Sequence, residues 1–135
     1  SVDDPVIKYV PEIAGRGLDM LTIRDLLLMS TGIRYAEHPT PFGDDALTYY
    51  SPDLRRTALR VRASGEPIGG EWLYNNYHPL LEGLILERVT GVSMSEYLQE
   101  KFWKPMGAEY SASWSLDSEA SGFERQSDSA REVGT

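Results

Sequence analysis

The residues best placed to do chemistry lie where a Gly- and Pro-rich turn, Gly65 to Gly70, leads through a short aromatic segment into a long apolar helix pattern. Turns of this kind present side chains at the lip of a cleft, and Tyr74 and Asn76 stand at the end of this one. A free phenol has a pKa of about 10, so Tyr74 can act as a general base near neutral pH only beside a stabilising ammonium. Tyr74 and Asn76 are therefore the first candidates for a site.

Both candidates also have an ordinary structural interpretation. Tyr74 lies between Trp72 and Tyr77 and fits a buried aromatic position, which is the commoner role for such a residue. Asn75 or Asn76 fits the cap of the helix that follows, the commonest use of Asn at such a place. From the residues alone, both interpretations stay open.

Composition favours one soluble globular domain, because 41% of the 135 residues are hydrophobic and 25% are charged. No apolar run approaches the roughly 20 residues that a membrane-spanning helix needs. The chain has no Cys, and its two histidines, His38 and His78, stand far apart beside prolines. The sequence therefore predicts no disulfide, metal site or cofactor, and it gives both histidines surface or structural roles.

Charge narrows the class of partner. The formal net charge of −8 disfavours nucleic acid, because phosphate binding draws its affinity from clustered Lys and Arg. One basic cluster exists, and it comprises Arg55, Arg56, Arg60 and Arg62. This pattern predicts the solvated face of a helix, with an anion site as the alternative.

Periodicity and capping signals predict a mainly α-helical chain. Helix starts are expected at Asp3-Asp4-Pro5, at the capping boxes Thr22 to Asp25 and Ser93 to Glu96, and at Ser51-Pro52-Asp53. The longest helix is expected from about Asn76 to Thr90, with Gly91 as a left-handed stop. The apolar positions expected to face the core include Leu27, Val89 and Phe102.

Two stretches fall outside this helical pattern. Residues 34–48 resemble a long surface excursion, with a turn of helix near Asp45 to Tyr50. Alternating small polar and apolar residues predict at most a short strand near 112–117, where Trp114 and Asp117 have structural roles. The predicted organisation is one helical lobe, 1–122, followed by a polar, poorly ordered tail, 123–135.

Five segments in order resemble one family. They are Leu21 to Ile33 ("LTIRDLLLMSTGI"), Gly70 to Asn76 with its Tyr-x-Asn element, Leu84 to Gly91 ("LILERVTG"), Tyr97 to Gly107 and Trp114 to Asp117. Together they resemble the serine β-lactamase and penicillin-binding-protein superfamily. The most similar branch is the class C β-lactamase-like group, which includes 6-aminohexanoate-dimer hydrolases and related esterases. The resemblance spans roughly Val2 to Phe123.

The resemblance implies a parent α+β fold and a serine acyl-transfer enzyme acting on a small-molecule amide or ester. The family's nucleophile stands in a Ser-x-x-Lys helix, and a Lys-Thr-Gly-like strand lies beside its oxyanion hole. Neither motif occurs in this chain. The chain is therefore expected to be a helical portion that is inactive alone, with missing N- and C-terminal segments of the same fold as its partners.

The family pattern also assigns roles to residues. Tyr74 is expected to help move a proton from the serine to the leaving group, assisted by the absent lysine. Asn76 is expected to orient the substrate carbonyl or that lysine by donating from its amide. Tyr35 and Tyr49 are candidates for lining a substrate pocket, although packing within the excursion explains them equally well.

Two other classes of function remain open. The chain could be a non-catalytic binding or sensor module derived from the same fold. It could also be a helical fragment that survives through self-association, since a lobe without its covering sheet exposes apolar surface. The substrate and the compartment, bacterial cytoplasm or periplasm, are not determined by the residues.

Overall fold

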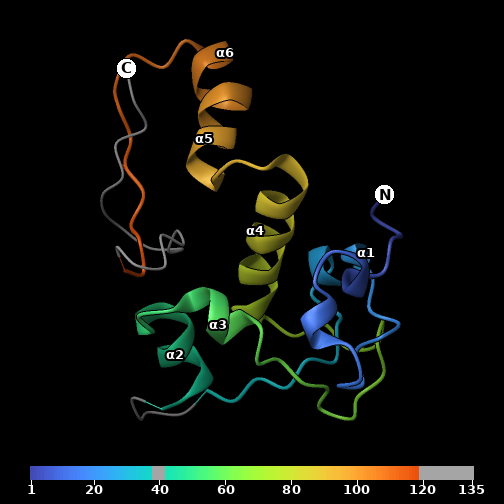
Figure 1. Ribbon diagram of the computed structural model, residues 1–135. Helices are drawn as coiled ribbons and strands as arrows, with labels where there is room; N and C mark the ends of the chain where they lie inside the picture. Colours follow the sequence, from blue (N-terminus) through green and yellow to red (C-terminus); the bar gives the residue numbers. More distant parts are fainter. Residues whose placement is uncertain (38–41, 119–135) are drawn as a thin grey trace.

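The computed structural model describes residues 1–37 and 42–118, and the regular structure of this part is helical (Figure 1). This confirms the predicted mainly α character of the chain. In chain order the elements are η1 (Val6–Lys8), η2 (Pro11–Ile13), α1 (Ile23–Leu27), α2 (Asp44–Tyr50), α3 (Leu54–Ala58), α4 (Tyr77–Thr90), α5 (Met94–Leu98), η3 (Gln99–Trp103) and α6 (Lys104–Met106). None of the helices in these residues is long and apolar enough to cross a membrane.

At most a short strand was predicted near 112–117, and among the described residues no strand forms there. Ser113 and Leu116 each lie in an isolated β-bridge, and a bridge of one residue does not make a strand. Isolated bridges do join Pro5 with Thr22 and Ile33 with Ala63. The tail predicted at 123–135 lies outside the described residues.

The helix predicted from Asp3 is replaced by the two 3-10 turns η1 and η2. Pro11 has no N–H to donate and restricts the residue before it, so an α-helix cannot continue through it. The Val6 N–H is also diverted, since it donates to the Leu21 carbonyl at 2.7 Å. Val6 and Ile13 still reach the core.

Helix α1 begins at the predicted capping box. The Thr22 hydroxyl accepts from the Asp25 N–H, and the Asp25 carboxylate accepts from the Thr22 N–H. The helix ends at Leu27, which is 57% exposed, so the prediction that Leu27 is buried is wrong. A helix this short buries one side of a single turn, and that side is occupied by Leu26.

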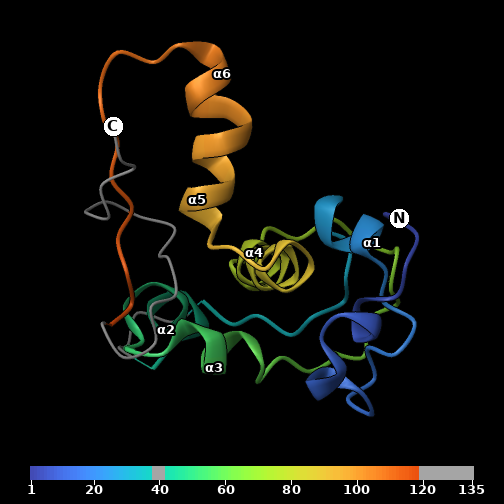
Figure 2. The same cartoon turned by 45° about the horizontal axis from the view of Figure 1, so that its top comes forward.

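Helix α4 is the central element, with α1 on one side and α2 and α3 on the other (Figures 1 and 2). It begins and ends close to the predicted residues, and Gly91 has the predicted left-handed conformation, with φ of 74°. Its fully buried leucines, Leu80, Leu81 and Leu84, join a core that includes Leu26 and Leu54 from its neighbours.

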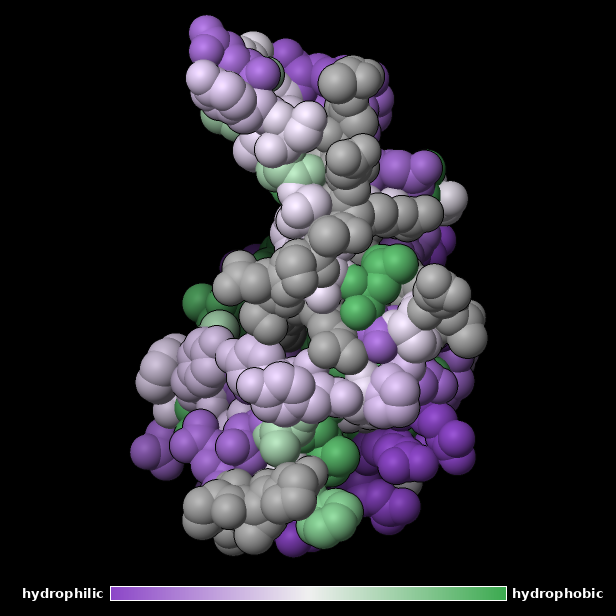
Figure 3. Space-filling view, turned by 90° about the vertical axis from the view of Figure 1, so that its left-hand side faces the viewer, coloured by the Kyte–Doolittle hydropathy of each residue, from purple (hydrophilic) through white to green (hydrophobic). Residues whose placement is uncertain are grey.

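Helices α5 and α6, with the π-helical turn η3 between them, rise away from the body as an arm (Figures 1 and 3). The predicted capping box of Ser93 and Glu96 is present at its base. Phe102 was predicted to face inward, but it is 57% exposed, and Val89 on α4 is exposed as well. No described element covers these positions.

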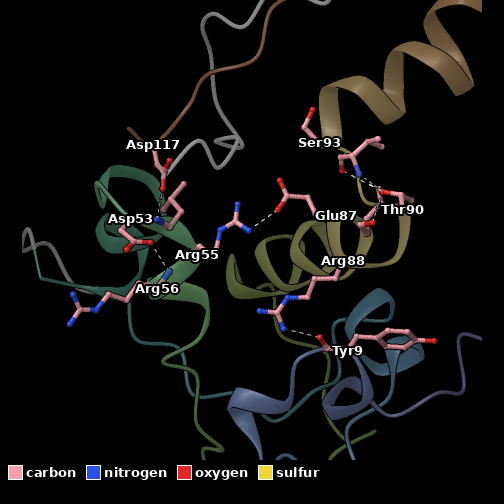
Figure 4. Close-up of polar contacts among 12 residues, drawn as sticks. Tyr9, Asp53, Arg55, Arg56, Glu87, Arg88, Thr90, Ser93 and Asp117 are labelled. Atoms are coloured by element: carbon pink, nitrogen blue, oxygen red, sulfur yellow. Dashed lines mark hydrogen bonds and ion pairs between the residues drawn. The ribbon is translucent and has the colours of Figure 1, made fainter. Parts of the chain in front are cut away.

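The chain returns from the arm towards α2 and α3. There the Asp117 carboxylate is buried and accepts from the Leu54 N–H at 2.7 Å, at the start of α3 (Figure 4). This confirms the structural role predicted for Asp117.

Candidate functional site

Tyr74 stands at the end of an irregular segment that is fastened alongside residues 29–32. The Gly69 N–H donates to the Ser30 carbonyl at 2.7 Å, and the Leu73 N–H donates to the Met29 carbonyl at 2.9 Å. Two of the motifs picked out in the sequence therefore lie side by side. Tyr74 is 48% exposed, so it is not the buried aromatic that the alternative interpretation expected.

Asn76 is buried, and two protein oxygens hold its side chain. Its amide nitrogen Nδ2 donates to the Tyr35 hydroxyl at 2.9 Å and to the Thr48 hydroxyl at 3.2 Å. Thr48 in turn donates to the Asp44 carbonyl at 2.7 Å. The excursion and α2 thus fix the orientation of the amide immediately before α4.

This geometry bears on the chemistry that Asn76 can perform. Both N–H bonds of its amide point at protein oxygens, whereas the expected role was donation to a substrate or a lysine. The carboxamide oxygen is the acceptor of the same group, and it suits an ammonium or an N–H. The two hydrogen bonds that Nδ2 donates fix the direction in which this oxygen points.

Tyr35 is a neutral hydrogen-bonding group. Burial raises its pKa to about 12, so its hydroxyl keeps its proton at physiological pH. Its ring meets the Tyr77 ring edge to face, with centroids 6.0 Å apart. The Tyr77 hydroxyl donates to the Asp44 carboxylate at 2.7 Å, which ties the start of α2 to the start of α4.

The two predicted pocket tyrosines differ in their placement. Tyr35 is hydrogen-bonded to Asn76, as a site residue would be. Tyr49 lies on α2 and packs against Tyr50, with ring centroids 6.2 Å apart.

Asn75 and His78 have structural roles. The Asn75 carboxamide oxygen accepts from the Tyr77 N–H at 2.9 Å and so satisfies the first amide of α4, whereas the N-cap position itself is Asn76 and makes no side-chain cap hydrogen bond. His78 is buried, its Nε2 lies 2.7 Å from the Thr31 hydroxyl oxygen, and burial lowers its pKa to about 4. This confirms a structural role for His78, and His38 lies outside the described residues.

Thr48 belongs to the same cluster but was not singled out from the sequence. It lies on the buried side of α2, where a threonine is unremarkable and its partner is 28 residues away. The only hint in the sequence was its hydroxyl group, because a buried hydroxyl needs a hydrogen-bond partner.

A cavity of about 230 Å³ adjoins this cluster, and its lining includes Thr31, Ile33, Tyr35, Leu73 and Asn75. It opens between the excursion and the irregular segment that carries Tyr74. Within the described part of the chain, no group of three or more His, Asp or Glu side chains is placed to hold a metal ion.

The sequence profile of the Beta-lactamase family matches residues 1–133. The chain is 29% identical over 133 residues to the 6-aminohexanoate-dimer hydrolase of Paenarthrobacter ureafaciens, covering 88% of this chain and 33% of that protein. Overall, it spans about a quarter to a third of the length of the curated relatives it matches.

Solved structures show the same similarity. One is an octameric penicillin-binding protein homologue from Pyrococcus abyssi, with a TM-score of 0.64 and 33% identity over 83% of this chain and 27% of that one. Another is a D-stereospecific amidohydrolase from Streptomyces sp., with a TM-score of 0.61 and 26% identity over 83% of this chain and 36% of that one. With a family profile that matches nearly all of its length, the chain belongs to the Beta-lactamase family.

Proposed function

We propose that this chain is the helical portion of a serine hydrolase that cleaves amide or ester bonds through an acyl-enzyme. Two of the similar proteins are named as an amidohydrolase and as a hydrolase of the 6-aminohexanoate dimer. These names favour an amide as the substrate class. The nucleophilic serine, its lysine and the oxyanion-hole strand would come from segments outside this chain.

The observation that carries the proposal is the placement of Tyr74 and Asn76. The Tyr74 ring is half exposed at the end of the segment, and Asn76, two residues later, is buried and held by Tyr35 and Thr48. One side chain can therefore reach a reacting group, while the other is fixed in orientation. A proton carrier beside a rigid orienting group is what acyl transfer requires.

In this mechanism the serine oxygen attacks the carbonyl carbon of the substrate, and Tyr74 takes part in receiving the serine proton. The same proton then passes to the leaving amine or alcohol as the carbonyl carbon releases it. Water hydrolyses the acyl-enzyme by the reverse use of the same proton carrier. Asn76 orients a partner of the reaction and does not itself react.

An apolar groove supports the proposal that further segments of the fold pack on this chain. The groove is about 560 Å³ in volume, and its lining includes Val2, Ile23, Leu27, Ile85, Leu86 and Val89. Exposed apolar surface of this kind marks a place where another surface packs. Glu82 also lines it, and burial raises the pKa of its carboxyl group.

The test is acylation by a fluorophosphonate or penicillin probe, applied to this chain and to a longer protein that adds the missing segments. We expect labelling of the longer protein alone. Tyr74→Phe in the longer protein should lower turnover at least about tenfold, the lower range for loss of a proton-transfer group. Tyr110→Phe is the matched control, because Tyr110 is exposed on the segment beyond α6.

Unchanged turnover in Tyr74→Phe would remove Tyr74 from the mechanism. A longer protein that resists acylation but binds a peptide or a β-lactam would favour the binding or sensor module instead. Labelling of this chain alone would overturn the proposed inactivity.

Self-association is a second proposal, and it rests on the same apolar groove. The Pyrococcus abyssi homologue is described as octameric. We expect this chain to form oligomers when no other segment fills the groove. Sedimentation velocity tests this, and a monomer across the micromolar range would count against it.

A further inference from the structure

A pocket of about 330 Å³ lies between the excursion and the segment that follows α3, and three arginines line it. These are Arg34, Arg60 and Arg62. Phe42, Asp44 and Tyr77 line its other sides. We call this the arginine pocket.

Backbone pairing brings two of the arginines together. Ile33 and Ala63 form an antiparallel bridge, and the Arg34 N–H donates to the Arg62 carbonyl at 2.9 Å. Arg34 therefore stands directly opposite Arg62, with both side chains on the face away from buried Ile33. Like charges in such a pair repel each other and destabilise the pairing.

Arg60 extends the cluster. Val61, between Arg60 and Arg62, is buried, while both arginines are exposed. Burial and the hydrogen bond to Asp44 raise the pKa of Tyr77, and the positive charge of Arg60 opposes that rise. This places Arg60 close to the Tyr77 hydroxyl at one side of the pocket.

The three arginines differ from four of the five other arginines in the described residues, the exception being exposed Arg56 on α3. The guanidinium groups of Arg24, Arg55 and Arg88 pair with carboxylates, and that of Arg16 donates to backbone carbonyls. Figure 4 shows the contact of Arg55 with Glu87, and it also shows a second hydrogen bond of Arg88, donated to the Tyr9 carbonyl. Within residues 1–37 and 42–118, no ion pair or hydrogen bond is formed by the guanidinium groups of Arg34, Arg60 or Arg62.

This is unusual in a protein with a formal net charge of −8, where carboxylates outnumber basic groups. One carboxylate, Asp44, does line the pocket. It accepts from the Tyr77 hydroxyl and from the Ala36 N–H, each at 2.7 Å. Three guanidinium groups against one carboxylate leave an excess of two positive charges around the pocket.

Guanidinium groups bind oxyanions through paired, parallel N–H donors, and carboxylate and phosphate oxygens match that geometry. Phe42 supplies an apolar wall, and this residue is 83% exposed. We infer that the arginine pocket binds a small molecule that carries a doubly charged oxyanion, such as a phosphate monoester, on an apolar group. The sequence had favoured a solvated helix face for Arg60 and Arg62, with an anion site as the alternative.

The first test measures binding of inorganic phosphate and of acetate to the 135-residue chain by calorimetry at constant ionic strength. Phosphate should bind at least about fivefold more tightly than acetate, because it matches both excess charges. Equal affinity for the two anions, or no heat from phosphate beyond that of added chloride, would overturn the inference.

Variants locate the site. Arg34→Gln with Arg62→Gln should weaken phosphate binding at least about tenfold, because both opposed guanidinium groups are lost. Arg34→Lys with Arg62→Lys should give an intermediate loss, since it keeps charge but not the paired donors. Arg56→Gln is the matched control, because Arg56 lies on α3 outside the pocket lining and points away from α4 in Figure 4. An equal loss in the control would show screening of overall charge and would refute the site.

The apolar part of the ligand is tested separately. Phenyl phosphate should bind more tightly than inorganic phosphate, and Phe42→Ala should abolish that preference while leaving phosphate binding unchanged. A preference that survives Phe42→Ala would refute the apolar wall. Circular dichroism of each variant confirms that the helices are retained.

Discussion

The amide nitrogen of Asn76 lies 3.2 Å from the hydroxyl oxygen of Thr48, across 28 residues of intervening chain. The Thr48 hydroxyl donates its own proton to the Asp44 carbonyl. Towards Asn76 its oxygen therefore acts as an acceptor. Because Thr48 lies on α2, the position of this helix helps to fix the direction of the Asn76 side chain.

Replacing Thr48 with Val should therefore destabilise the fold. The shape is kept, but a buried Asn76 N–H loses its acceptor, which costs about 1–3 kcal/mol. Urea unfolding measures the difference. Thr48→Ser is the control, since it keeps the hydroxyl, and it should cost less. Equal losses in the two variants would assign the effect to the threonine methyl group.

Stability should fall on mild acidification because of His78. Its pKa is lowered from 6.5 to about 4 in the folded chain, so the unfolded chain binds more protons between these pH values. Stability from this group is complete above pH 6.5 and is lost as the pH falls towards 4. Between pH 7 and pH 5 the loss should be about 2 kcal/mol.

Urea midpoints at pH 7 and pH 5 measure this loss. His78→Gln should reduce the pH dependence, because it removes the group whose pKa is lowered on folding. A pH dependence that persists in His78→Gln would trace the effect to carboxyl groups.

Gly32→Ala should disturb the segment that carries Tyr74. Gly32 has φ of +63°, and an added Cβ would lie 2.5 Å from the Glu66 carbonyl oxygen, which is backbone and cannot easily move. Gly15 has a similar φ of +73° but nothing within 4 Å of its Cβ position. Gly32→Ala should therefore cost roughly 1–3 kcal/mol more than Gly15→Ala, the range for forced overpacking.

Thermal unfolding of the two glycine variants gives the comparison. Fluorescence of Trp72, in the same segment, should change in Gly32→Ala alone. Similar costs in both variants would mean that backbone strain, and not the contact with Glu66, controls this turn.

Asp117→Ala should release the start of α3. The Leu54 N–H would lose its acceptor, and its hydrogen exchange should accelerate at least about tenfold, because a hydrogen bond to a charged group contributes about 1.5–3 kcal/mol. The Arg56 N–H, which donates to Asp53 at 2.8 Å, reports on the same helix and should be little affected. Equal acceleration at both amides would mean that the whole of α3 has unfolded.

Local signals in the sequence were sufficient where a residue and its partner are neighbours. The capping boxes at Thr22 and Ser93 and the stop at Gly91 were predicted correctly, because each depends on contacts within a few residues. The prediction of a helix from Asp3 was wrong. Pro11 interrupts it, and the Val6 N–H donates to the distant Leu21 carbonyl and not to a residue of its own helix.

Residues whose role depends on distant partners were harder to predict. Thr48 was missed, since its partner Asn76 comes from another element, whereas Tyr35 was found through its place on the excursion. Phe102 was assigned to the core by its spacing, but spacing does not reveal whether another element lies opposite. The arginine pocket also depends on pairing between segments, since the bridge of Ile33 with Ala63 brings Arg34 to Arg62.

The hydrogen bond between Asp117 and Leu54 joins the two ends of a long stretch of chain. This stretch runs from α3 through α4 and the arm and returns to the start of α3. Within the same loop of chain, Arg55 of α3 pairs with Glu87 of α4 at 3.0 Å, which ties these two helices of the body together. A sideways pull on the arm would therefore be transmitted to the first turn of α3 before it strained the leucine core.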